Sequence, residues 1–135
     1  MVNITEIITI HLKSKNLKIL IAEDDEASHF LLSLMLKDVS QELLHARTGL
    51  EAIELCRANP DIDLILMDVK MPIFSGYEAT QQIREFNLGV IIIAQTAHVL
   101  RGDREKAISL GCNDYLTKPI MKTKLLSTIN KYFSG

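Results

Sequence analysis

The stretch from residue 63 to residue 76 constrains the fold more strongly than any other. Residues 64–67 are all apolar and show no alternation with polar side chains, which is typical of a strand buried on both faces of a parallel sheet. The run ends at the carboxylate of Asp68, and the turn formers Pro72 and Gly76 precede a helical pattern. Because open α/β sheets bind ligands beyond the carboxyl ends of their strands, Asp68 is a candidate functional residue. The alternative is that Asp68 only caps the loop or the next helix.

The rest of the chain repeats this alternation of strand and helix. Strands are predicted at residues 18–22, 42–46, 63–68, 90–94 and 114–117. Helices are predicted at residues 27–37, 49–58, 76–86, 100–110 and 121–132. Five strands that alternate with five helices predict a doubly wound α/β fold, with a parallel sheet covered on both faces.

The first 16 residues stand apart from this pattern. Their isoleucines and leucine share one helical face, at Ile4, Ile7, Ile8 and Leu12. We expect residues 1–16 to be an N-terminal extension or linker and residues 17–135 to form the domain. A short amphipathic helix is the alternative for the first segment.

Size and charge exclude several functions. A chain of 135 residues, 47% of them hydrophobic and 24% charged, is long enough for one globular domain. A net charge of −2 leaves no basic surplus for a nucleic-acid backbone. No apolar run is long enough for a bilayer, and the start lacks the pattern of a signal peptide. Cys56 and Cys112 are expected to be free, buried thiols. Together these features predict a cytoplasmic domain without membrane contact.

Polar side chains gather where the predicted strands end. The first strand ends in Asp24 and Asp25, the third in Asp68, the fourth in Thr96 and the fifth in Lys118. In a parallel sheet these ends lie on one edge. Neighbouring carboxylates raise one another's pKa, and a hard cation such as Mg²⁺ relieves that repulsion. This edge is therefore predicted to bind Mg²⁺.

The same residue types meet the needs of phosphoryl transfer. A carboxylate can be the nucleophile that forms an aspartyl-phosphate, and the phosphoryl oxygens need charge neutralisation. Lys118 could supply a cation and Thr96 a hydrogen bond. Taken singly, Asp24 and Asp25 could merely cap the first helix, and Thr96 and Lys118 could be ordinary surface residues. Their coincidence on one edge favours the phosphoryl site.

The motifs together resemble a response-regulator receiver domain of two-component signalling, most like the receivers of hybrid histidine kinases. The residues that carry the resemblance are Glu23-Asp24-Asp25, residues 67–72 with Gly76, Thr96-Ala97, and residues 114–119. The resemblance covers about residues 17–133. It implies the flavodoxin-like strand order 2-1-3-4-5 and the transfer of a phosphoryl group from a histidine protein.

The resemblance also implies roles for the residues of the acidic edge. Asp68 would be the phosphoacceptor and Asp25 a direct Mg²⁺ ligand. Asp24 would complete the acidic site, through a metal-bound water, and the backbone carbonyl of Lys70 would be a further ligand.

Three further residues take roles by the same resemblance. Thr96 and Lys118 would bind the phosphoryl group, and Tyr115 would be the aromatic switch residue. The bond between Lys118 and Pro119 is expected to be cis.

The partner is expected to be a histidine kinase or a histidine phosphotransfer protein, which would dock on the helix at residues 27–37. The helical period puts the core-facing side at Ala27, Phe30, Leu31, Leu34 and Met35. Leu32 and Leu36 then fall on the solvent side, where two leucines exceed what the core needs. The alternative is that single exposed leucines are ordinary and that Leu36 packs against the following loop. Ile120 could extend this apolar patch.

Two other functions remain open. A small phosphohydrolase with an aspartate nucleophile would want a second acid two residues after Asp68, and Lys70 occupies that position. A phosphorylation-independent binding module would not need the acidic edge, Thr96 and Lys118. We expect a module that catalyses only its own phosphorylation and dephosphorylation, either as a single-domain regulator or, as we favour, an excised receiver.

Overall fold

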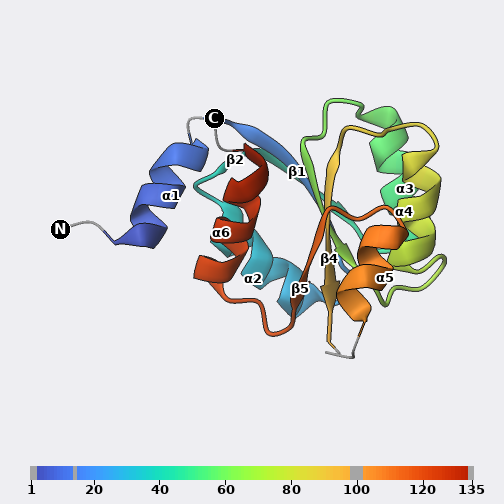
Figure 1. The fold of residues 1–135 in the computed structure, drawn as a ribbon. Coiled ribbons are helices and arrows are strands. Elements are labelled where there is room, and N and C mark those ends of the chain that lie inside the picture. The colour runs from blue at the N-terminus through green and yellow to red at the C-terminus, as the bar shows by residue number, and fades with distance from the viewer. Residues whose placement is uncertain (1–2, 14, 98–101, 134–135) are drawn as a thin grey trace.

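The computed structural model describes residues 3–13, 15–97 and 102–133. They form three layers, in which helices cover both faces of one parallel sheet (Figure 1). The strands lie in the order β2-β1-β3-β4-β5, and all four neighbouring pairs are parallel. The predicted doubly wound fold and its strand order 2-1-3-4-5 are confirmed.

The elements follow the predicted alternation closely. The strands are β1 Leu17–Ala22, β2 Ser40–Ala46, β3 Leu64–Asp68, β4 Ile91–Thr96 and β5 Asp114–Thr117. The helices are α1 Ile4–Lys13, α2 Glu26–Leu36, α3 Gly49–Ala58, α4 Gly76–Arg84, α5 Asp103–Ser109 and α6 Lys122–Phe133. The described residues thus hold six helices, one more than predicted, because the N-terminal segment is helical.

Two apolar cores lie on the two faces of the sheet. Helices α2 and α6 cover one face, and α3, α4 and α5 cover the other (Figure 1). Strand β4 contributes to both cores, since Ile93 packs on the α2–α6 side while Ile92 and Ala94 pack on the α3–α5 side. Every residue of β3 is buried, as the unbroken apolar run predicted.

Helix α1 packs against α6 (Figure 1). Ile8 and Leu12 are buried in the α2–α6 core, and the hydroxyl oxygens of Thr5 and Thr123 lie 2.9 Å apart. The amphipathic helix that was the alternative for this segment is therefore present, and it shares the apolar core of the sheet. The domain boundary at residue 17 stays a prediction.

The orientation predicted for the first domain helix, α2, was wrong. Leu32 and Leu36 are only 3% and 0% exposed, whereas Phe30, Leu31 and Leu34 are 61%, 54% and 52% exposed. The helix carries apolar residues on both sides, and the side with more of them faces solvent. A helical period defines faces, but only the packing of α2 on the sheet decides which face is buried.

Helix α5 is shorter than predicted. It follows Gly102, whose φ of 88° is left-handed and which provides no side-chain cap. The predicted start of this helix at residues 100 and 101 lies outside the described residues. Within the described part of the chain, no helix has the length and apolar character needed to cross a membrane.

Candidate phosphoryl-transfer site

The carboxyl ends of β1, β3 and β4 bring the predicted site residues to one edge of the sheet. Asp68 is the last residue of β3 and is buried. The loop after β3 returns to it, since the backbone N–H of Gly76 donates to the carbonyl of Val69 at 2.9 Å. A Cβ at Gly76 would collide with the carbonyl oxygen of Asp68. Glycine therefore lets the loop and the start of α4 approach the candidate phosphoacceptor closely.

Three carboxylates meet at this edge. Ligand oxygens of Glu23, Asp24 and Asp68 all lie within 4.8 Å of one another. Glu23 is fully buried and Asp24 is exposed, so the cluster is open to solvent on one side. Carboxylate oxygens are the ligands that hard cations such as Mg²⁺ prefer. The donor set therefore fits the expected metal.

Asp25 lies outside this cluster. It is the N-cap of α2, where its Oδ2 accepts hydrogen bonds from the backbone N–H and the hydroxyl of Ser28, both at 2.8 Å. These bonds hold the pKa of Asp25 below its usual value. Of the three acidic side chains expected to hold Mg²⁺, the structure brings Asp24 and Asp68 together and places Asp25 at the helix cap. The capping alternative holds for Asp25, while Glu23, to which the sequence analysis gave no role, joins Asp24 and Asp68.

Lys118 bridges two of the clustered acids. Its Nζ lies 3.0 Å from Oε1 of Glu23 and 3.4 Å from Oδ1 of Asp68. Burial by itself would lower the pKa of Lys118, but the hydrogen bond to Glu23 and the charge of Asp68 raise it above the usual value. Lys118 therefore stays cationic beside the candidate phosphoacceptor. The predicted cis bond to Pro119 is present.

Burial raises the pKa of Asp68 to about 7, and the neighbouring Glu23 adds to this shift. The Lys118 ammonium and the backbone N–H of Lys70, which lies 3.3 Å from Asp68 Oδ1, act in the opposite direction. A nucleophilic carboxylate must be ionised. A further cation at this site would lower the pKa of Asp68 and so favour its ionised form.

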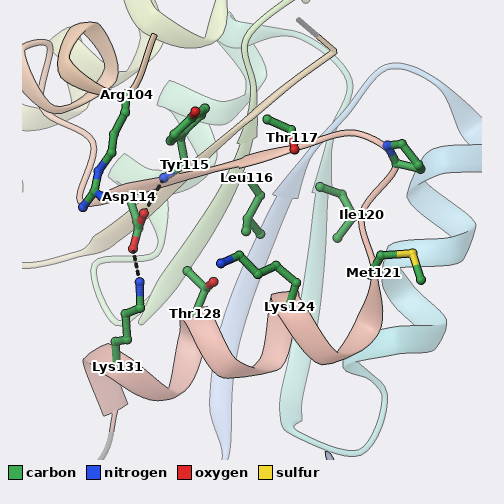
Figure 2. Close-up of a pocket in the computed structure, with 11 residues that line it drawn as sticks. Arg104, Asp114, Tyr115, Leu116, Thr117, Ile120, Met121, Lys124, Thr128 and Lys131 are labelled. Atoms are coloured by element: carbon green, nitrogen blue, oxygen red, sulfur yellow. Dashed lines mark hydrogen bonds and ion pairs between the residues drawn. The ribbon is translucent and has the colours of Figure 1, made fainter. Parts of the chain in front are cut away.

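Thr96 is the last residue of β4, and Tyr115 is the second residue of the neighbouring strand β5. Thr96 is buried, and its carbonyl accepts a hydrogen bond from the N–H of Lys118 at 2.8 Å. Tyr115 is half-buried, packs against the α3–α5 core and lies across β5 from Leu116 (Figure 2). Figure 2 also shows Asp114 paired with Lys131, whose Nζ lies 3.2 Å from Asp114 Oδ2. This pair ties the start of β5 to α6.

An apolar groove of about 400 Å³ adjoins the acidic cluster. Its walls come from α2 and from the loop after β5, and its lining residues are Ser28, Leu31, Leu32, Met35, Gln95, Lys118, Pro119 and Ile120. Ile120 lies where the sequence analysis expected an extension of the apolar patch. Lys118 lines the groove and contacts the acids, so the groove and the acidic cluster are continuous.

This fold and this edge of charged residues define a family. The chain belongs to the response regulator receiver domains, whose sequence profile matches residues 19–130. It is therefore a receiver domain of two-component phosphorelay signalling, as the motifs predicted.

Individual relatives support the assignment. The chain is 37% identical over 117 residues to two-component system protein A of Emericella nidulans, and the match covers 85% of the chain but 17% of that protein. The receiver domain of Ssk1, solved in complex with the histidine phosphotransfer protein Ypd1 of Saccharomyces cerevisiae, is 33% identical with a TM-score of 0.80, and the match covers 87% of this chain and 89% of that one.

A third relative was solved with a metal. The receiver domain of the sensor histidine kinase PA1611 from Pseudomonas aeruginosa holds a magnesium ion in its active-site cleft. It is 32% identical with a TM-score of 0.78, and the match covers 89% of this chain and 99% of that one.

Proposed function

We propose that Asp68 accepts a phosphoryl group from a phosphohistidine of a partner protein in a Mg²⁺-dependent reaction. The observation that carries the proposal is the placement of the buried Asp68 carboxylate beside the acids of Glu23 and Asp24 and 3.4 Å from the Lys118 ammonium. We further propose that residues 17–135 are the receiver domain and that residues 1–16 are an extension to it.

Each residue has a distinct part in the transfer. An ionised oxygen of Asp68 attacks phosphorus, the P–N bond to the donor imidazole breaks, and the imidazole leaves with the electron pair. Lys118 neutralises charge on a phosphoryl oxygen, and the Thr96 hydroxyl donates to another. Glu23, Asp24, Asp68 and the carbonyl of Lys70 would hold Mg²⁺, which supplies charge neutralisation to the acids and the phosphoryl group.

The competing functions have less support. Lys70 is a cation where an aspartate-based phosphohydrolase would want a second acid, so catalysis of self-phosphorylation and dephosphorylation is the proposed extent of the chemistry. A module that binds without phosphorylation would have no need for the acidic cluster and its bridging lysine.

Thr96 and Tyr115 are proposed to report phosphorylation. Movement of the Thr96 hydroxyl toward the phosphoryl group would leave space into which the half-buried Tyr115 turns. The short helix α5, with no side-chain cap at Gly102, is the element whose position this motion would bias. Beryllofluoride should shift amide resonances along β5 and α5, and shifts confined to the acidic cluster would contradict the switch.

The partner is proposed to be a histidine kinase or a phosphotransfer protein, docked by its histidine-bearing helix on α2 and the adjoining groove. Phe30, Leu31 and Leu34 form an exposed apolar face of α2, in place of Leu32 and Leu36. Continuity with the acidic cluster through Lys118 supports this location, as does the complex of the similar Ssk1 receiver with Ypd1. A cytoplasmic location and no nucleic-acid contact are proposed from the composition.

Labelling by acetyl phosphate tests the phosphoacceptor. Intact-mass spectrometry of the protein incubated with acetyl phosphate and Mg²⁺ should show the addition of one phosphoryl group. A chelator and the Asp68→Asn substitution should each abolish it. Equal labelling of the Asn variant would move the acceptor to another residue.

A further inference from the structure

The loop between β3 and α4 carries two residues in a strained backbone conformation. Ile73 and Phe74 have φ angles of 49° and 68°, in the left-handed region that residues with a side chain rarely adopt, β-branched ones least of all. The side chain of Ile73 is 62% exposed, so its packing offsets little of this cost. Residues strained in this way persist only where the surrounding structure holds them, and they are common beside functional sites.

The first turn of α3 holds this loop. The backbone N–H of Gly49 donates to the carbonyl of Pro72 at 3.4 Å, and that of Leu50 donates to the carbonyl of Ile73 at 3.1 Å. The first N–H groups of a helix have no acceptor within the helix, and here the loop supplies their acceptors. A Cβ at Gly49 would collide with the carbonyl oxygen of Phe74. Glycine therefore lets α3 approach the loop closely enough to hold it.

The same loop carries the backbone of Lys70 beside the candidate phosphoacceptor. The N–H of Lys70 donates to Asp68 Oδ1 at 3.3 Å. Only Met71 separates Lys70 from Pro72. This link is stiff, because the proline ring fixes its own φ and restricts the residue before it. A displacement of the loop at Pro72 is therefore transmitted to the backbone of Lys70.

We infer that Gly49 is a positioning residue for the metal site, because the first turn of α3 holds the loop in the form that places the Lys70 backbone beside Asp68. The inference rests on the proposed function, in which the carbonyl of Lys70 is a Mg²⁺ ligand. Gly49 acts on the metal only through the loop. A side chain at this position would displace the loop and weaken Mg²⁺ binding, while the carboxylates of the cluster stay in place.

The test compares two glycine-to-alanine variants. Gly49→Ala introduces the colliding Cβ. Gly89→Ala is the matched control, because a Cβ at Gly89, between α4 and β4, would meet no heavy atom of the described residues within 4 Å beyond its chain neighbours. The dissociation constant of Mg²⁺ is measured without a phosphodonor, from amide chemical shifts during a Mg²⁺ titration. The rate of labelling by acetyl phosphate is then measured as a function of Mg²⁺ concentration.

Gly49→Ala should raise the Mg²⁺ dissociation constant about tenfold or more, as is common when a group that orients a metal ligand is lost. Gly89→Ala should leave it within about twofold of wild type. The Mg²⁺ concentration that gives half-maximal labelling should rise together with the dissociation constant. The rate at saturating Mg²⁺ should return to that of wild type, because Asp68 and Lys118 are unchanged.

A second substitution separates positioning from a general loss of stability. Asparagine adopts the left-handed region more readily than a β-branched residue, so Ile73→Asn makes the native form of the loop less costly. Added to Gly49→Ala, it should restore Mg²⁺ affinity by about threefold or more. In the wild-type background it should change the affinity by less than about twofold, because α3 already holds the loop.

A third variant loosens the same turn without a collision, and it decides the question if Gly49→Ala does not fold. The side-chain oxygen of Thr48 caps α3 by accepting from the N–H of Glu51 at 3.0 Å. Thr48→Ala should raise the Mg²⁺ dissociation constant about threefold, since the lost cap lets the first turn fray. An unchanged constant in this variant would contradict the positioning role.

Two other results would overturn the inference. Equal dissociation constants for Gly49→Ala and Gly89→Ala would mean that α3 does not position the metal ligand. No recovery of affinity when Ile73→Asn is added to Gly49→Ala would mean that the conformation of the loop does not limit Mg²⁺ binding. Failure of the proposed function is separate, because the wild-type protein would then bind no Mg²⁺ and take no phosphoryl group from acetyl phosphate.

Discussion

The acidic cluster and the apolar groove adjoin at the carboxyl edge of the sheet, and Lys118 belongs to both. In the cluster, the buried Glu23 is paired with a cation and Asp68 lies beside one. In the groove, the lining side chains are mostly apolar, and Ser28, Gln95 and Lys118 are the polar ones among them. The contrast suits the two proposed tasks, in which the cluster binds a phosphoryl group and the groove contacts the partner protein.

Removing one acid of the cluster should have the largest effect. Asp24→Asn should slow Mg²⁺-dependent labelling by acetyl phosphate by at least about 100-fold, since even outer partners of metal ligands commonly contribute 10–100-fold. Asp25→Asn is the matched control, because asparagine caps a helix as well as aspartate does. Its rate should stay near wild type. The reverse pattern would restore Asp25 as the metal ligand.

The two faces of α2 should differ in stability. Leu36→Ala should lower the free energy of unfolding by about 3 kcal/mol, because it leaves a cavity in the α2–α6 core. Leu34→Ala should change it by less than about 0.5 kcal/mol, because Leu34 is exposed. Urea denaturation measures both. Equal losses would mean that α2 is rotated from its position here.

A charge on the groove wall should affect only the protein donor. Leu31→Glu should lower the ratio of transfer from Ypd1 to transfer from acetyl phosphate by about tenfold or more, because it places a carboxylate against the docked helix. Leu88→Glu changes an equally apolar but 84% exposed side chain on the loop before β4. Its ratio should match wild type. A ratio that falls equally in both variants would move the docking surface elsewhere.

The acid–base behaviour of Asp68 should make the stability of the protein depend on pH. Its pKa is raised to about 7 from a usual value of 3.8, so between these values the folded state binds more protons than the unfolded state. Without Mg²⁺, the free energy of unfolding should therefore fall as pH rises from about 4 to about 7, by about 3 kcal/mol. Asp68→Asn should remove that component.

Chemical denaturation of both proteins across this pH range measures the difference, and carboxylates that do not interact with Asp68 cancel in it. A difference that does not change with pH would place the pKa of Asp68 near its usual value.

Periodicity and composition determined most of the fold. Unbroken apolar runs such as residues 64–67 indicated strands buried on both faces, and their alternation with helices predicted the doubly wound sheet. Because parallel strands end at one edge, the positions of Asp68, Thr96 and Lys118 followed from chain order alone. The sequence also indicated the cation requirement, because several acids at one edge repel.

Two features could be decided only by the tertiary structure. One is which of several neighbouring acids joins the cluster, and the other is which face of α2 is turned toward the sheet. Four consecutive acids follow β1, and only the path of the chain into α2 determines that Glu23 turns inward and Asp25 caps the helix. Both sides of α2 are apolar, so only its contact with the sheet could assign Leu36 to the core and Leu31 to the groove.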